Sequence, residues 1–181
     1  ETLTDPSYAG QIVIQTAPHI GNTGVNDEDA ESRRIWVAGY AVREAARIPS
    51  NWRSQRSLDE ELADQGIVGI RGIDTRALTR RLREVGAMRA GIFSGEQAER
   101  PRAELLAEVR DSAGMLGRRL AEEVSITEEQ IVEPADWGWE GEPRGTVVAV
   151  DLGIKSMTPR RFAERGLRTV IVPADTGFQR I

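Results

Sequence analysis

The sequence contains no cysteine, only one histidine and no long hydrophobic run. Without cysteine there is no disulfide framework, no thiolate metal site and no cysteine nucleophile. No apolar stretch approaches the ~20 residues that a membrane-spanning helix needs, which excludes a membrane protein. The 24 basic and 29 acidic side chains give a net charge of -5, which argues against general nucleic-acid binding. Composition therefore favours a soluble globular protein with small-molecule or protein partners.

The length and the two ends of the sequence indicate a fragment. The 181 residues can hold one domain and part of another, and the sequence stops at Ile181, a few residues past an apparent strand. Between residues 130 and 145, prolines, glycines and tryptophans alternate, which is typical of a connector. We therefore expect a domain boundary near residue 144, separating residues 1–144, truncated at their start, from residues 145–181.

The opening segment places a short apolar run, residues 11–16, between two polar loops. In the first loop we expect a turn, because Pro6 fixes φ and the Asp5 side chain can bond the backbone two residues on. Such a turn presents the Ser7 hydroxyl on stiff chain. His19, in the second loop, has no nucleophile beside it, and we expect a structural or loop-ordering role for it.

Two helices have clear start signals. Ser57 and Glu60 form a capping box, and Asp74 can cap a helix over residues 75–84. The spacing of three apolar residues on the second helix predicts that they face the core: Leu78, Leu82 and Val85. Three arginines follow the same spacing on another side: Arg76, Arg80 and Arg83. From the residues alone a solvated face is favoured for them over a surface for a partner or an anion.

Other segments give simpler expectations. Residues 36–42 and 88–93 resemble strands, and residues 101–109 resemble a helix. Trp52 is expected to pack on the core rather than to bind a partner. The acidic run 26–31 lacks the glycine that a calcium loop requires, so a solvated loop is favoured over a metal site.

The end of the sequence has a β-α-β pattern. Residues 146–153 form an apolar run that predicts a strand buried on both faces of a parallel sheet. Thr158 can cap a helix that ends at Gly166, and residues 167–173 predict a second strand. Gly153 stands alone, without the glycine pattern of a nucleotide-binding loop. A free-standing nucleotide-binding protein is therefore disfavoured.

Several strings together resemble one family. They are LTDPSYAGQIV, PHIGNTGVNDED, PSNWRS, IVGIRGIDTRALTRRLREVGAM, LAEEVS and VVAVDLGIK. In sequence and order they are similar to the small, glutaminase subunit of carbamoyl phosphate synthetase. Met157 and Arg119 depart from the residues that are common in this family, at positions that carry no chemistry.

The resemblance implies an α+β fold class in two parts. Residues 1–144 would form the β/β/α amino-terminal domain that docks on the large subunit. Residues 145–181 would form the first βαβ of an α/β class I glutamine amidotransferase domain. The family is cytoplasmic and forms a heterodimer that serves arginine and pyrimidine biosynthesis.

The resemblance also implies an activity. The small subunit hydrolyses glutamine, and ammonia passes to a large subunit that makes carbamoyl phosphate from bicarbonate. ATP and Mg²⁺ belong to the large subunit, so no cofactor or metal is expected in this chain. The catalytic cysteine, histidine and glutamate would lie beyond Ile181, so the fragment alone should be inactive.

Two residues of the TDPSY string take roles from the resemblance. Ser7 matches a serine that contacts the bound glutamine, and Asp5 resembles an acidic residue near the ammonia route. From the residues alone, a simple turn is favoured for both. The alternative function is a non-catalytic docking module that binds the large subunit through Arg76, Arg80 and Arg83.

Overall fold

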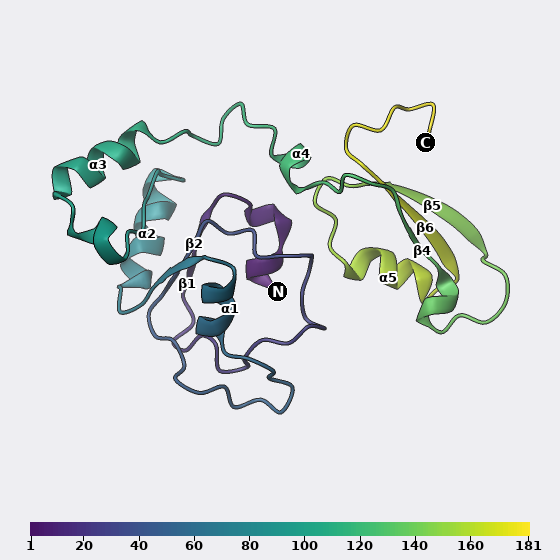
Figure 1. Ribbon diagram of the computed structural model, residues 1–181, viewed down its shortest axis with the longest axis horizontal. Coiled ribbons are helices and arrows are strands. Elements are labelled where there is room, and N and C mark those ends of the chain that lie inside the picture. The colour runs from purple at the N-terminus through teal and green to yellow at the C-terminus, as the bar shows by residue number, and fades with distance from the viewer. The chain divides into compact units, whose positions relative to one another are not determined.

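The computed structural model describes all residues from 1 to 181. It is an α+β protein with two three-stranded sheets, ordered β1-β2-β3 and β4-β6-β5 (Figure 1). The chain forms two compact units. The turn unit contains residues 1–9, 30–33 and 119–181, and the central unit contains residues 10–29 and 34–118. The α+β class is therefore confirmed.

The central unit is built on a parallel sheet. Its strands are β1 (Ile12–Gln15), β2 (Gly39–Val42) and β3 (Val68–Ile70). Strand β2 lies in the middle, with Gly39 opposite Ile12 on one side and Val68 on the other. All four residues of β2 are buried. The apolar run before it supplies further core side chains: Ile35, Trp36 and Val37.

The helix start signals of the central unit are confirmed. Helix α1 (Leu58–Asp64) has the complete capping box, in which the Ser57 amide donates to the Glu60 carboxylate over 2.7 Å. Helix α2 (Thr75–Val85) is capped by Asp74, which accepts from the Ala77 amide at 2.9 Å. Helix α3 is Arg102–Asp111. Short 3₁₀ helices in the whole chain are Thr2–Thr4, Pro6–Tyr8, Gly95–Glu99 and Pro134–Trp137.

Three expectations for the central unit are wrong. Residues 88–93 form no strand, because no neighbouring strand pairs with them and Gly91 weakens a β conformation. On α2, Leu78 and Val85 are 40% and 45% exposed, and only Leu82 is half-buried. The helix has the expected apolar side, but little of the chain covers it. Trp52 is 93% exposed and does not anchor the core.

The β-α-β pattern of the turn unit is confirmed. Strand β5 (Gly145–Val150) runs parallel to β6 (Leu167–Val172) over six residue pairs, and α5 (Met157–Ala163) connects them. The helix begins one residue before Thr158, which therefore does not cap it. Strand β5 is not buried on both faces: its residues alternate between half-buried and exposed. Only one face of this small sheet is covered.

The segment expected to be a connector contains a strand. Strand β4 (Gln130–Val132) pairs antiparallel with β6, on the edge opposite β5. Helix α4 (Leu120–Val124) precedes it. The expected boundary near residue 144 thus falls within the turn unit, between two strands that pair with the same neighbour. The boundary itself stays a prediction.

No helix in the structure has both the length and the apolar character needed to cross a membrane.

Candidate functional site

The predicted turn at the start of the chain is present. Asp5 precedes the 3₁₀ helix Pro6–Tyr8, and its Oδ1 accepts a hydrogen bond from the Ser7 amide at 2.9 Å. We call residues 5–8 the Asp5 turn. Asp5 and Pro6 are buried, whereas Ser7 is exposed. The aspartate thereby holds the Ser7 amide and also bonds the Ser7 side chain, although Ser7 as a residue is exposed.

A lysine that the sequence did not single out completes the turn. Lys155 Nζ lies 2.8 Å from Asp5 Oδ2 and 3.9 Å from Glu31 Oε1. Lys155 stands in the loop after β5, at the carboxyl end of a parallel strand, where α/β sheets bind their ligands. That placement is the signal that could have identified it.

The two charges of this ion pair stabilise each other. Burial raises the pKa of Asp5, but hydrogen bonds from Lys155 and Ser7 outweigh burial and hold it below its ordinary value. The hydrogen bond to Asp5 raises the pKa of Lys155. Both groups are therefore charged at neutral pH.

The loop that carries Lys155 is fixed by a buried carboxylate. Asp151 Oδ1 accepts from the amides of Gly153 at 2.9 Å and Ile154 at 2.8 Å, and Oδ2 accepts from the Ile126 amide at 2.7 Å. Asp151 is only 3% exposed. Hydrogen bonds to a buried carboxyl group are costly to lose, because the amides and the group would be left without partners. The β5–α5 loop is therefore a stiff support.

The Asp5 turn packs directly on this loop. Gly153 has φ +96°, and a Cβ built on it would lie 3.0 Å from the Pro6 Cβ and 3.0 Å from the Val124 Cγ2. Glycine is required there both by the positive φ and by the close approach of Pro6. The backbone of the loop thus determines where the turn lies.

A third segment ties the turn to the loop. The Glu31 amide donates to Thr4 Oγ1 at 2.9 Å, and Ser32 Oγ donates to the Thr4 carbonyl at 2.6 Å. From the other side, the Ser156 amide donates to the Glu31 carbonyl at 2.8 Å. Residues 30–33 therefore bond both to Thr4, next to the Asp5 turn, and to Ser156, next to the β5–α5 loop. The site offers the hydroxyl of an exposed serine, bonded to the aspartate of an ion pair, which suits hydrogen bonding to a polar ligand rather than nucleophilic attack.

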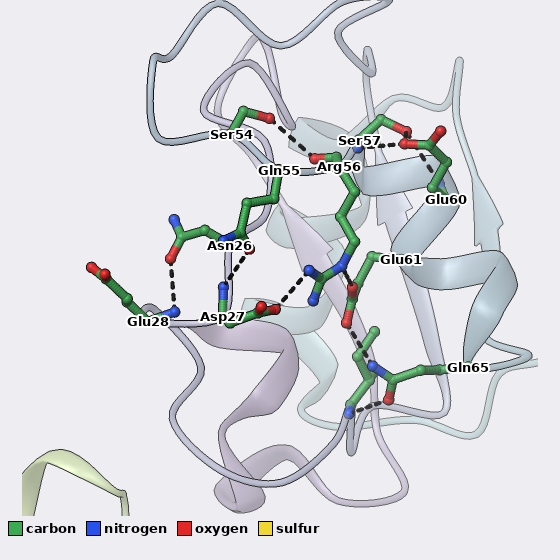
Figure 2. A network of polar contacts seen from close by, with 11 residues as sticks. Asn26, Asp27, Glu28, Ser54, Gln55, Arg56, Ser57, Glu60, Glu61 and Gln65 are labelled. Carbon is green, nitrogen blue, oxygen red and sulfur yellow. Dashed lines mark hydrogen bonds and ion pairs between the residues drawn. The ribbon is translucent and has the colours of Figure 1, made fainter.

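The first residues of the acidic run, 26–28, take part in a separate polar network in the central unit (Figure 2). Arg56 bonds Glu61, and its Nη1 lies 2.7 Å from Asp27 Oδ1. Glu61, which is buried, also accepts from Gln65 Nε2 at 2.6 Å. Figure 2 shows these side chains joining residues 26–28 to the first turns of α1. The network serves to hold the loop to the helix.

The remaining predicted site residues lie in the central unit. His19 Nε2 is 3.6 Å from Glu44 Oε2, and both side chains are about two-thirds exposed. Arg76, Arg80 and Arg83 are exposed on α2. The structure contains no group of three histidine, cysteine, aspartate or glutamate side chains that could hold a metal ion.

The fold and the site define an α+β protein in which a polar turn is fixed at the carboxyl end of a parallel β-α-β unit. Residues 1–92 match the family model of the carbamoyl-phosphate synthase small chain, CPSase domain. The chain belongs to this family.

Curated relatives carry the same description. The carbamoyl phosphate synthase small chain of Streptomyces coelicolor is 64% identical over 174 residues, which cover 96% of this chain and 44% of the relative. The small chain of Corynebacterium glutamicum is 58% identical over 183 residues, which cover 100% of this chain and 45% of the relative. The small chain of Mycobacterium tuberculosis is 57% identical over 183 residues, which cover 100% of this chain and 48% of the relative. The chain spans about half the length of the curated relatives it matches.

Proposed function

We propose that the chain is part of the glutamine-hydrolysing subunit of a carbamoyl phosphate synthase. The whole subunit would release ammonia from glutamine and pass it to a large subunit for ATP-dependent synthesis from bicarbonate. The observation that supports this best, beside family membership, is that the Asp5 turn belongs to the same compact unit as the β-α-β segment. That segment would be the beginning of the class I glutamine amidotransferase domain.

In this proposal Ser7 contacts the substrate. Its hydroxyl can donate to or accept from the polar groups of glutamine, and the bond from its amide to Asp5 limits where it can point. Asp5, with Lys155, would border the ammonia route. The cysteine, histidine and glutamate of catalysis would be supplied by the half of the subunit outside this sequence. ATP and Mg²⁺ would be used by the large subunit.

The substrate contact is tested by Ser7→Ala in the full-length subunit. Losing one neutral hydrogen bond should raise the KM for glutamine about two- to tenfold and leave kcat nearly unchanged. Steady-state ammonia release measures both constants. If neither constant changes, Ser7 is only a turn residue.

A second candidate function is docking on the large subunit through Arg76, Arg80 and Arg83. The observation that favours it is that all three arginines are exposed and share one side of α2. A basic surface of this kind suits an interface that steers an acidic partner.

Charge reversal tests the docking surface. Arg80→Glu should slow association with the large subunit, more strongly at low salt, because exposed charges act mainly on the rate of encounter. The matched control is Arg102→Glu, which reverses an exposed arginine on α3. Equal association rates of the two variants, measured by surface plasmon resonance, would remove α2 from the interface.

A further inference from the structure

Glu31 has a carboxylate that the fold does not explain. Its Oε2 is buried without a hydrogen-bond partner, and its side chain is only 16% exposed. A buried carboxylate oxygen without a donor is costly, because it has lost its water and gained no bond in return. A neutral side chain of the same size would avoid most of this cost. The cost therefore calls for an explanation in what surrounds the carboxylate.

The charge of Glu31 faces Lys155. Oε1 lies 3.9 Å from Nζ, which is beyond a hydrogen bond but within the range of direct charge attraction. The same Nζ is 2.8 Å from Asp5 Oδ2. One ammonium group thus lies between two carboxylates, bonded to one and attracted by the other.

These contacts lead from Glu31 to Ser7. Lys155 holds one carboxylate oxygen of Asp5, and the other oxygen holds the Ser7 amide at 2.9 Å. The Lys155 side chain is 44% exposed, so packing restrains its flexible carbon chain little. The contact of Nζ with Asp5 is therefore its main restraint. Attraction from Glu31 adds a second restraint on Nζ and thereby on the Asp5 carboxylate.

We propose that Glu31 is a positioning residue that acts through Lys155 and Asp5 to set the place of the Ser7 hydroxyl. This inference rests on the proposed function, in which Ser7 contacts glutamine. The charge of Glu31 can be removed without breaking the hydrogen bonds that hold residues 30–33 in place. The Glu31 backbone, not its carboxylate, bonds to Thr4 and Ser156.

The test is Glu31→Gln in the full-length subunit assembled with its large-subunit partner. We expect the KM for glutamine to rise about two- to fivefold, the effect of losing a partly exposed charge interaction, with kcat unchanged. Glu31→Asp, which keeps the charge, should lie closer to the parent enzyme. The matched control is Glu133→Gln, which breaks an ion pair with Arg168 at the β4–β6 edge and should leave KM unchanged.

A double variant separates positioning from general destabilisation. If Glu31 acts through Ser7, then Ser7→Ala combined with Glu31→Gln should have the same KM as Ser7→Ala alone. Two increases that multiply would overturn the inference, and so would an unchanged KM in Glu31→Gln. Either result would leave the proposed function standing if Ser7→Ala raises KM. No change in Ser7→Ala would instead refute the substrate contact on which the inference rests.

Discussion

Replacing Gly153 by alanine should destabilise the protein through two separable effects. The first is backbone strain, because φ is +96° and a left-handed conformation costs an L-residue about 1–2 kcal/mol. The second is crowding, because the new Cβ would lie 3.0 Å from both Pro6 and Val124, and overpacking typically costs about 1–3 kcal/mol. We therefore expect Gly153→Ala to lower the free energy of unfolding by about 2–5 kcal/mol.

Gly141 is a matched control for the first effect. Its φ is +95°, but a Cβ there would meet nothing within 4 Å. Gly141→Ala should therefore cost only the strain, about 1–2 kcal/mol. The difference between the two variants measures the contact between the Asp5 turn and the β5–α5 loop.

Urea unfolding of the full-length subunit, followed by circular dichroism, measures both variants. Crowding should also displace Pro6, so Gly153→Ala, unlike Gly141→Ala, should raise the KM for glutamine. Equal losses of stability in the two variants would refute the reasoning, because they would show that the turn does not press on the loop.

Three further outcomes are expected. Asp151→Ala removes the acceptor of three backbone amides and should cost about 3 kcal/mol or more in urea unfolding; a loss under 1 kcal/mol would contradict the hydrogen-bond pattern. The pKa of Asp5 is lowered on folding, so its stabilising effect is present above its ordinary value of 3.8 and is lost as the pH falls below it. The stability lost in Asp5→Asn should accordingly shrink between pH 6 and pH 3, and a constant difference would exclude this linkage. Trp52→Ser should change the free energy of unfolding by less than about 0.5 kcal/mol, since the side chain is 93% exposed, and a larger loss in urea would reveal packing.

Local signals in the sequence predicted local structure well. The capping box of Ser57, the cap at Asp74 and the turn bond of Asp5 each join residues two or three positions apart. Their geometry follows from residue type and spacing alone, so the local sequence is enough to predict these caps and this turn. The β-α-β pattern is almost as local, since its strands are separated only by one helix.

Features that depend on distant residues were missed or mistaken. The pairing of Asp5 with Lys155 and the place of β4 beside β6 require a knowledge of which segments meet. The spacing of apolar residues on α2 identifies an apolar side but not what covers it, and Leu78 proved exposed. Residue type alone places Trp52 in the core, whereas its side chain is exposed in the structure.

The turn unit is assembled from three stretches of chain, with the whole central unit between them in sequence, and this has a consequence for the order of folding. Ser156 Oγ donates to the Ala30 carbonyl across a separation of 126 residues. During synthesis, the central unit is complete before the β5–α5 loop exists, so the Asp5 turn at first has residues 30–33 beside it but not the loop that supports it. Contacts at such long separation form late, because much of the chain must be ordered before they are gained. Maturation of the site should therefore be slower than folding of the central unit, and the nascent turn is exposed to proteases until its support is made.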